Sequence, residues 1–506
     1  MKATRSIAWI LLAVMLTLSV LSCGKMEDGK VTTAATSTAV TTTAEATSDT
    51  SATETAAPEA VAPALPDADY KKEDFIILVN ANTNDYRSVE FAATEITGSV
   101  VNDAVYTRNV AIEDRYNVEL VGLVTKSEAK ALETSVLASV HTYDLALLRL
   151  MDAGGLALKG LLMDLNTVPN LYLEGAWWDQ NAVSDLSLAN RLYMVTGDMN
   201  INDKDMTWCM FFDKGLAEEH GLPDLYALAS NKEWTFEKFG TLCQNVSADL
   251  NGDGVYDDND RYGHVTVYAR STIAYMYSMD AMIFVKDEND LPVLTEQNDK
   301  LFDAYEVARS LFFTDNVCHD IETMPTNGYA NRWRRSEAMF GNKQILFYAE
   351  AMQNAERFRD FSNDFGILPI PSAEEGVYGK HMVWRESYVT VAPLTLGGSA
   401  ELTDRAGLLL EAIQRESTDT ILPAYYETAL KSKFSRDDSS SDMIDIIFAN
   451  RYYDIGAYYD WGDMTDAWMS QGKAGNESVA SAIKAQRKVT ERALKECVAA
   501  LTGGTT

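Results

Sequence analysis

A run of acidic and amide side chains between residues 249 and 260 has the spacing of a calcium-binding loop. Calcium takes about six to eight oxygen ligands, which such a loop supplies from its first, third, fifth, seventh, ninth and twelfth positions. Gly254 stands at the sixth position, where the chain must turn sharply. The sequence therefore predicts a structural Ca2+ held by Asp249, Asn251, Asp253, the carbonyl of Val255, Asp257 and Asp260.

The last ligand of this loop departs from the usual pattern. Asp260 stands where most such loops carry Glu, so the loop resembles the dockerin type. An acidic turn without metal remains an alternative, although its clustered carboxylates would repel one another without a cation. We expect the calcium ion to stabilise the fold, not to make the protein a calcium sensor.

Aromatic side chains are the second group of residues in this chain that could bind a ligand. The sequence contains nine Trp and 24 Tyr. Flat aromatic faces combined with converging hydrogen-bonding groups are what a carbohydrate site needs. For each single aromatic residue, packing in the core remains the alternative.

Sequence motifs of enzymes are missing. There is no nucleophile elbow, phosphate loop, HExxH or CxxC pattern, and Cys209, Cys243, Cys318 and Cys497 are isolated and predicted to be buried thiols. The net charge of −32 excludes a nucleic-acid-binding surface. We therefore expect a binding protein and no enzyme, although a catalytic carboxylate pair among the 75 acidic residues remains an alternative.

The elements that must position these residues begin with an alternating α/β pattern. Short apolar runs at 75–79, 118–121 and 143–148 predict three strands, the first of them buried, separated by helical patterns. A capping box at 125–128 opens the second of these helices, with Leu132, Val136 and Leu137 on its apolar face. Such units form a parallel sheet that binds ligands at the carboxyl ends of its strands. Candidate contacts after the first strand are Asn82, Asp85 and Tyr86.

The later part of the chain is richer in helix. An extended segment at 365–371 contains two prolines, which exclude a central strand. A further strand is predicted at 388–393, and helices are expected in the last 80 residues, ending with residues 480–501. A length of 506 residues suggests two or three domains.

The first 70 residues are predicted to lie outside the fold. Residues 1–22 read as a signal peptide, with Lys2 and Arg5 before an apolar run. Val20 to Cys23 resembles the lipobox of bacterial lipoproteins, which implies that Cys23 is lipidated with acyl chains such as palmitate. Residues 23–70, rich in Thr, Ala and Ser, would form a disordered tether at the extracytoplasmic face of the cell membrane.

Taken in order, these features resemble the extracellular solute-binding proteins of bacterial ABC importers, family 1, which includes the maltose-binding type. The resemblance covers nearly all of the chain after the leader. Besides the lipobox and the tether, it rests on Gly160–Leu165, Ala176–Asp179, Met210–Lys214, Glu218–Leu222, Glu233–Phe236, Phe340–Lys343, Leu368-Pro369 and Pro423–Asp437.

The resemblance implies an α/β fold with two lobes, the type II fold of periplasmic binding proteins, with a helix-rich second lobe. Lobe 1 would hold residues 71–196 and 371–420, and lobe 2 residues 197–370 and 421–506. The chain would cross between the lobes near residues 195–198, 368–371 and 420.

The resemblance also suggests where a solute binds. Family members often place cleft residues where Trp177 and Trp178 stand, and Asp198 lies at the first expected crossing. Three further candidates lie past the second crossing and two lie in the C-terminal helical region. These five are Trp384, Arg385, Tyr388, Trp461 and Asp463.

The implied function is the capture of a small solute, an oligosaccharide by expectation, and its delivery to the permease subunits of an ABC transporter. We expect a monomer. A lipoprotein of the same fold that presents its ligand to a membrane kinase is the principal alternative, followed by a carbohydrate-active enzyme and by a surface protein that binds long polymers.

Overall fold

The computed structural model describes residues 62–80, 91–296, 298–314, 316–359, 361–426 and 439–502. The predicted leader, the lipidation site at Cys23 and the tether up to residue 61 lie outside these described residues. Three candidate solute contacts, Asn82, Asp85 and Tyr86, lie outside them as well. No helix among the described residues is long and apolar enough to cross a membrane.

The first sheet confirms the strands predicted near the N-terminus. Its strands follow the order β12-β3-β1-β2, and β1 lies parallel to both β2 and β3. β12 comes from much later in the chain and runs antiparallel to β3, so that Tyr388 lies opposite Arg149. The strands are β1 (Glu73–Asn80), β2 (Val118–Thr125), β3 (Leu145–Arg149) and β12 (Tyr388–Val391).

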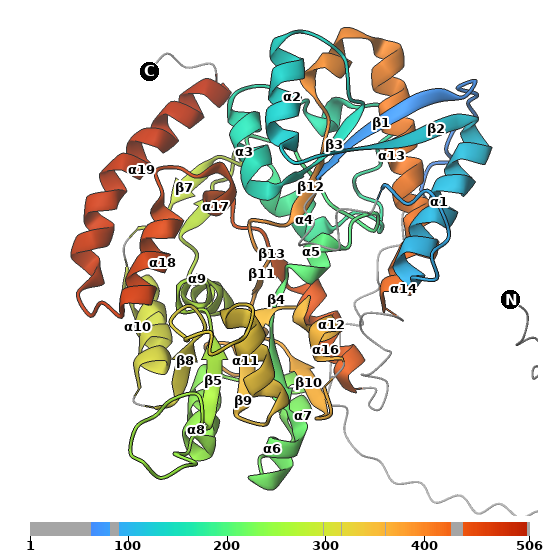
Figure 1. Ribbon diagram of the computed structural model, residues 1–506. Coiled ribbons are helices and arrows are strands. Elements are labelled where there is room, and N and C mark those ends of the chain that lie inside the picture. Colours follow the sequence, from blue (N-terminus) through green and yellow to red (C-terminus); the bar gives the residue numbers. More distant parts are fainter. Residues whose placement is uncertain are drawn as a thin grey trace, which may run out of the picture. The chain divides into compact units, whose positions relative to one another are not determined.

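Four helices pack around this sheet (Figure 1). They are α1 (Val100–Tyr116), α2 (Glu128–Leu137), α3 (Leu150–Leu158) and α13 (Ala400–Asp419). A buried ion pair between Arg405 of α13 and Asp144, which precedes β3, joins these two distant segments at 2.8 Å. The predicted α/β layer is therefore confirmed for this part of the chain.

The capping box predicted at 125–128 is wrong. The N-cap of α2 is Ser127, whose side chain makes no capping hydrogen bond. Thr125 still belongs to β2, where pairing with Asn80 of β1 holds it extended. Leu132 is buried as predicted, but Leu137 is 67% exposed, because it lies one position past Val136 and so faces away from the sheet.

The second sheet is mixed, with the strand order β10-β4-β9-β5-β8. β5 runs parallel to β8 and β9, whereas β4 runs antiparallel to β9 and β10. β10 is an edge strand followed by Pro369 and Pro371, which confirms that the prolines keep this segment out of the middle of a sheet. The strands are β4 (Trp208–Asp213), β5 (Tyr262–Thr266), β8 (Cys318–Asp320), β9 (Ile345–Ala351) and β10 (Phe365–Leu368).

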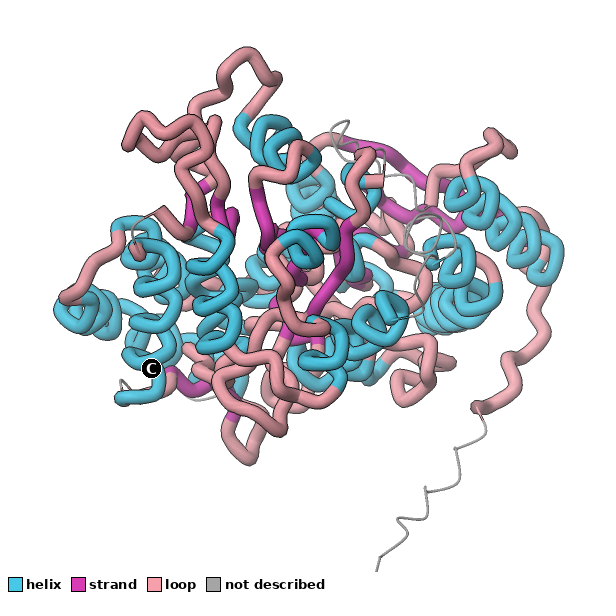
Figure 2. The backbone as a smooth tube through the Cα atoms, turned by 90° about the horizontal axis from the view of Figure 1, so that it is seen from below, coloured by secondary structure: helices cyan, strands magenta, loops and turns pink. Residues whose placement is uncertain are grey.

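Helices lie on both sides of this second sheet, as the view from below shows (Figure 2). Apolar residues recur at helical spacing on their inner faces, as with Phe239, Cys243 and Val246 of α8, and all three are buried. The helices are α6 (Lys214–Glu219), α7 (Leu225–Ser230), α8 (Phe236–Val246), α9 (Tyr268–Ser278), α10 (Asp299–Phe313), α11 (Arg332–Gly341) and α12 (Asn354–Phe358).

Three segments carry the chain from one sheet to the other. The first holds α5 (Asn202–Asp205), the second holds β11 (His381–Met382), and the third joins α13 to α14 (Ile421–Tyr425). The first two lie side by side, because isolated bridges pair Val195 with Thr390 and Thr207 with Val383.

A buried cation ties these connections together. The side chain of Arg451, 8% exposed, pairs with Asp179 at 2.9 Å and with Asp203 of α5 at 3.1 Å. Tyr453 also donates to Asp179, at 2.6 Å. Removing one partner from such a network would leave a buried charge uncompensated, so we regard it as a strong constraint on the connecting segments.

The C-terminal region is helical, as predicted. α17 packs on α3 of the first sheet, α16 on β10 of the second, and α18 on α9. The four described cysteines after the leader are buried and free, which confirms the prediction of isolated thiols. The elements not yet named are the helices α4 (Gln180–Leu186), α16 (Ser439–Ala449), α17 (Ile455–Tyr459), α18 (Met464–Ala474) and α19 (Val479–Thr502), the short helices η1 (Leu165–Thr167) and η2 (Leu394–Gly398), and the strands β6 (Phe284–Lys286), β7 (Pro292–Leu294) and β13 (Arg451–Tyr452).

Candidate functional site

Residues 383–388 run between the edges of the two sheets. The Trp384 N–H donates to the Met206 carbonyl at 2.9 Å, just before β4, and the Arg385 carbonyl accepts from the Met151 N–H of α3 at 3.3 Å. α3 follows the carboxyl end of β3, and α9 follows the carboxyl end of β5. The segment around Trp384 therefore contacts elements at the carboxyl end of β3 and at the start of β4, which belong to different sheets.

The Trp384 indole is the centre of this cluster. The Arg270 guanidinium carbon lies 4.8 Å from its ring centroid and that of Arg385 lies 5.3 Å away. The ring of Trp208 lies 6.3 Å away, tilted by 50°. Trp384 is 6% exposed, and its indole N–H has no hydrogen-bond partner in the described part of the chain. A buried donor without an acceptor costs about 1–3 kcal/mol, which an incoming oxygen atom would recover.

Two arginine–carboxylate pairs lie at this indole, and a third, Arg149 with Asp152, flanks Met151, whose N–H bonds the Arg385 carbonyl. Each pair joins one cation to one anion, so the cluster carries no net charge. The arginine side chains are partly exposed, by 39% for Arg149, 26% for Arg270 and 22% for Arg385. The pairs are Arg149 with Asp152 at 2.6 Å, Arg270 with Glu350 at 3.5 Å and Arg385 with Asp466 at 2.8 Å. We call these six residues and Trp384 the Trp384 site.

Glu350 positions the arginine that covers the indole. It lies in β9 and is 3% exposed. Burial raises the pKa of its carboxyl group, and the charge of Arg270 opposes that rise. One carboxylate oxygen accepts from the Ala351 N–H and from the Asn354 amide, both at 3.0 Å. The other oxygen faces Arg270 and holds it over Trp384.

Some of the predicted solute contacts come together here and others do not. Trp384, Arg385 and Tyr388 follow one another along this segment, and Tyr388 lies opposite Arg149. Trp178 instead donates its indole N–H to Glu411 of α13 at 3.1 Å, and is 2% exposed. Trp177 is covered by the guanidinium of Arg415, 4.3 Å from its ring centroid. Both tryptophans thus pack against α13 in the structure.

The remaining candidates lie elsewhere. Asp198 lies in the first connection and accepts from the Thr418 hydroxyl at 2.7 Å; burial raises its pKa. Trp461 is 2% exposed and stacks on Tyr459, with ring centroids 5.3 Å apart. Asp463 is exposed at the start of α18. For these residues a role in solute binding stays a prediction.

Most members of the Trp384 site were missed from the sequence. Arg149 and Asp152 follow a predicted strand at its carboxyl end, so the same argument that selected Asp85 applied to them. Glu350 is the only charged residue of the strand ILFYAEA, which was a second usable signal. Arg270 and Asp466 gave no signal, because only the tertiary fold brings them to Trp384.

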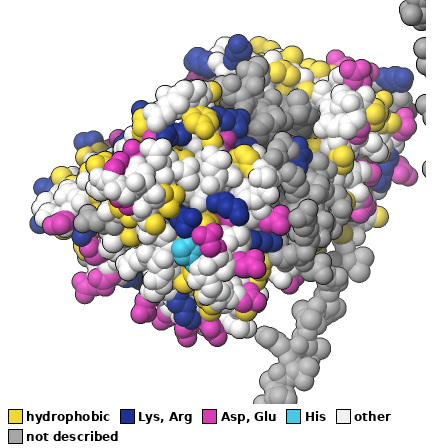
Figure 3. All heavy atoms as spheres, turned by 60° about the horizontal axis from the view of Figure 1, so that its bottom comes forward, with side chains coloured by type: hydrophobic (Ala, Val, Ile, Leu, Met, Phe, Trp, Pro, Cys, Tyr) yellow, Lys and Arg dark blue, Asp and Glu magenta, His cyan; other side chains and the backbone are white. Residues whose placement is uncertain are grey.

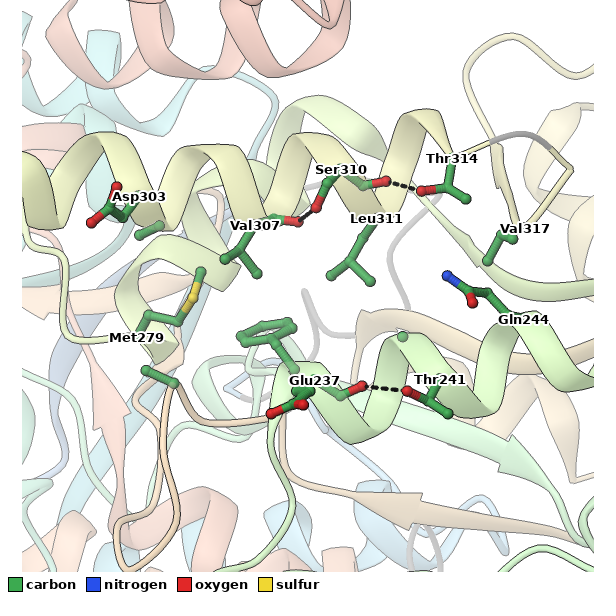
Figure 4. Close-up of a pocket in the computed structure, with 14 residues that line it drawn as sticks. Glu237, Thr241, Gln244, Met279, Asp303, Val307, Ser310, Leu311, Thr314 and Val317 are labelled. Atoms are coloured by element: carbon green, nitrogen blue, oxygen red, sulfur yellow. Dashed lines mark hydrogen bonds between the residues drawn. The ribbon is translucent and has the colours of Figure 1, made fainter.

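A pocket of about 480 Å3 lies between α8 and α10 on the second sheet (Figure 4). Val307 and Leu311 of α10 point toward α8 across it. The hydroxyl groups of Thr241, Ser310 and Thr314 donate to carbonyls of their own helices. The three hydroxyl groups of this pocket are therefore satisfied within their own helices, and none of its lining residues belongs to the Trp384 site, so we do not regard it as the solute site.

The loop at 249–260 turns as predicted. It connects α8 to β5, and paired backbone hydrogen bonds of 3.0 Å between Ala248 and Arg261 close its base. Gly254 has φ of 78°, which only glycine adopts without strain. Asp249 accepts from the N–H groups of Gly252 and Gly254, at 2.6 and 2.9 Å. Asp260 accepts from Leu250 at 2.9 Å across the loop.

The carboxylates of the loop do not converge on one point. No group of three or more His, Cys, Asp or Glu side chains in the described ranges is arranged to hold a metal ion. The oxygen atoms of Asn251 and Asp253 likewise face backbone N–H groups, those of Asp253 and Val255, at 2.9 and 2.8 Å. The loop has the predicted turn and donor spacing, whereas calcium binding stays a prediction.

The face drawn in Figure 3 carries no large patch of side chains of one charge sign. Lys and Arg side chains are interspersed there with Asp and Glu, and hydrophobic side chains are scattered among them. The net charge of −32 is therefore not gathered into one patch on that face.

The sequence matches no protein-family model and no curated protein. The fold, however, is similar to several solved structures. The MalE domain from Bdellovibrio bacteriovorus bound to maltotriose matches with a TM-score of 0.51 at 13% identity, covering 83% of this chain and 100% of that one. Maltose-bound MalE3 of T. maritima matches with 0.52 at 13%, covering 83% and 99%.

A third match is the ABC substrate-binding protein Lmo0181 from Listeria monocytogenes in complex with cycloalternan. Its TM-score is 0.51 at 11% identity, and it covers 83% of this chain and 99% of that one. The alignments span nearly the whole of each relative, so the likeness extends over both sheets. The chain therefore has the two-lobed α/β fold of the substrate-binding proteins of ABC transporters.

Proposed function

We propose that this chain is an extracytoplasmic solute-binding protein that captures a neutral oligosaccharide and delivers it to the permease of an ABC transporter. The observation that carries the proposal is the Trp384 site. There the guanidinium groups of Arg270 and Arg385, each paired with a carboxylate, flank an indole whose N–H has no partner among the described residues.

The chemistry of the site suits a sugar. Each guanidinium has five N–H groups and uses few of them on its carboxylate, so donors remain for solute oxygens. The carboxylates offer acceptors beside them. A sugar hydroxyl both donates and accepts hydrogen bonds, and the sugar ring stacks on aromatic faces. A charged solute would instead need an unpaired opposite charge, and the site has none among its six charged members.

Capture would couple binding to closure of the lobes. Arg149 and Asp152 belong to the first sheet and its helix α3, whereas Arg270 and Glu350 belong to the second sheet and its helix α9. A solute that contacts both groups binds the closed form better than the open form, which is the condition for hinge closure. The lobe boundaries at residues 196 and 420 are part of this proposal, whereas the second boundary lies near residue 381, because residues 372 and 376 still bond residues 232–236.

The solved relatives support this function. Three proteins of the same fold hold maltotriose, maltose and cycloalternan, and their names describe binding proteins, not enzymes. Anchoring through a lipidated Cys23, with a flexible tether, would keep the captured solute near the membrane. We also propose that the loop at 249–260 binds a structural Ca2+, because a cation would relieve the repulsion among the four of its five aspartates that are predicted ligands.

The test of this function is a thermal-shift and calorimetric screen against neutral mono- and oligosaccharides. A bound solute should raise the melting temperature by mass action. Deletion of the gene should abolish uptake of the same solute. Release of shorter sugars during incubation would contradict the proposal and indicate an enzyme. Binding with normal uptake but lost gene induction would favour the alternative, a sensor that presents its ligand to a kinase.

A further inference from the structure

A second pocket, of about 580 Å3, lies apart from the Trp384 site and shares no lining residue with it. Its walls come from the end of α3, from the turn around residues 188–193, from the end of α17 and from the last turns of α19. Cavities of about 300–1,000 Å3 are the size that takes small-molecule ligands. Its lining includes Arg191, Tyr193, Tyr459, Trp461, Glu496 and Cys497.

Two buried donors in the lining of this pocket lack an oxygen or nitrogen acceptor among the described residues. Tyr459 and Trp461 are 3% and 2% exposed, and their rings stack in parallel at 5.3 Å with 8° between the planes. Neither the Tyr459 hydroxyl nor the Trp461 indole N–H has a hydrogen-bond partner among the described residues. The Cys497 thiol near the indole is a weak acceptor that does not satisfy it. Buried polar groups are almost always paired in folded proteins, so this pair of donors points to an oxygen-bearing occupant.

The charges around the pocket are balanced. Lys159 and Arg191 supply two cations, and Asp460 and Glu496 supply two anions. Lys159 is already paired with Glu133 at 2.8 Å, outside the pocket lining. Arg191 is exposed, and its guanidinium bonds the Tyr193 hydroxyl at 3.4 Å. A neutral ligand with several hydroxyl groups matches two donors with flanking acceptors better than an ion does.

We propose that this pocket is a second binding site, for a small neutral sugar or polyol whose oxygens accept hydrogen bonds from Tyr459 and Trp461. The site is independent of solute capture at Trp384. Trp461 therefore binds a ligand outside the site between the two sheets.

Cys497 provides a local reporter of this pocket, because its thiol lines the cavity. The full-length protein is alkylated with and without glucose, maltose or glycerol, and peptide mapping reads the rate at Cys497 separately from the other cysteines. Burial raises the pKa of the Cys497 thiol, so alkylation is followed at alkaline pH. A bound ligand should slow the reaction several-fold.

Two variants separate this site from the first. Arg385→Ala weakens the Trp384 site, and protection of Cys497 should persist in it. Tyr459→Phe keeps the ring stack but removes one donor. The ligand concentration needed to protect Cys497 should then rise about tenfold. Calorimetry should still show binding at the Trp384 site. Because the hydroxyl removed is unpaired, this variant should fold at least as well as the parent protein.

Three outcomes would overturn the proposal. Unchanged alkylation with every sugar and polyol would mean that only water occupies the pocket. Protection that vanishes in Arg385→Ala would mean that closure at the first site causes it. Protection that is unaffected in Tyr459→Phe would mean that Tyr459 does not bind the ligand. None of these outcomes touches the proposed capture at Trp384.

Discussion

The Trp384 site and the loop at 249–260 are both rich in charge, but they are built in opposite ways. In the loop, carboxylates face N–H groups no more than ten residues away, such as Asp260 and the N–H of Leu250. In the Trp384 site, each carboxylate pairs with an arginine, and two of the three pairs join residues about 80 positions apart. Local bonds define a turn, whereas the long-range pairs bring distant segments of the chain together, so the two regions should respond differently to substitution.

Truncation of the central indole should have the largest effect. Trp384→Ala removes the buried ring and its free N–H, so we expect solute affinity to fall by about 2 kcal/mol or more, roughly 30-fold, as for a binding hot spot. Isothermal titration calorimetry measures this loss of solute affinity. Trp177→Ala is the matched control, since Trp177 packs against Arg415 and its loss should leave affinity unchanged. Equal losses in the two variants would contradict the placement of the site.

Removal of the loop's buried carboxylate should act on stability alone. Asp260 is 0% exposed and accepts from the N–H groups of Leu250 and Asp257. Asp260→Ala leaves those donors unpaired, and we expect the free energy of unfolding to fall by about 2 kcal/mol. Urea denaturation provides the measurement, with the exposed Asp253→Ala as the milder control. A change in solute affinity greater than twofold would link the two regions and refute their independence.

Calcium should stabilise the protein through the loop. At a free concentration ten times the dissociation constant, the gain would be about 1.4 kcal/mol. Thermal melts with calcium and with chelator measure the gain, and Asp249→Ala should abolish it. If the parent protein melts identically in both buffers, the loop is an acidic turn without metal.

The buried glutamate should make solute binding sensitive to acid. Because burial raises the pKa of Glu350, this carboxyl takes up a proton at a higher pH than a free glutamate does. Protonation removes the charge that holds Arg270 over Trp384, so affinity should fall by a few-fold as the pH is lowered through that raised pKa. Glu350→Gln should bind a few-fold more weakly at neutral pH and lose this dependence.

Protonation of Glu350 should change the stability of the fold in the opposite direction from solute affinity. A carboxyl group whose pKa is raised in the folded state makes the protein less stable as the pH rises through that pKa. Glu350→Gln should therefore flatten the rise in stability toward acid pH, measured by urea denaturation at several pH values. A variant with unchanged pH profiles of both affinity and stability would show that Glu350 does not titrate in this range.

The exposed aspartate of the C-terminal region should have the smallest effect. Asp463 lies at the surface at the start of α18. Asp463→Ala should change the free energy of unfolding by no more than about 0.5 kcal/mol, and solute affinity by less than twofold. A larger loss of affinity would restore Asp463 to the solute site.

The strands and the loop could be predicted from the sequence because their signals are local. The apolar run at β1 and the prolines after β10 determine buried and edge strands from a few neighbouring residues. The loop's turn follows from Gly254 and the spacing of its aspartates. The capping box failed because strand pairing held Thr125, a contact that the local pattern does not contain.

The solute site could be predicted only in part for the same reason. Trp384 and Arg385 were found because they follow the second connection between the sheets. Arg270, Glu350 and Asp466 reach the indole from β5–α9, β9 and α18, and no spacing in the sequence encodes that meeting. Trp178 was predicted as a solute contact but packs elsewhere. Its indole N–H donates to Glu411 on α13, more than 200 residues later in the sequence.

The most direct test of the central claim is a crystal structure of the protein with a neutral oligosaccharide from the binding screen. We predict a solute oxygen within hydrogen-bonding distance of the Trp384 indole N–H, with further contacts to Arg149 of the first sheet and Arg270 beside the second. A solute that touches only one of the two sheets' edges, or that leaves the Trp384 N–H unpaired, would contradict the account.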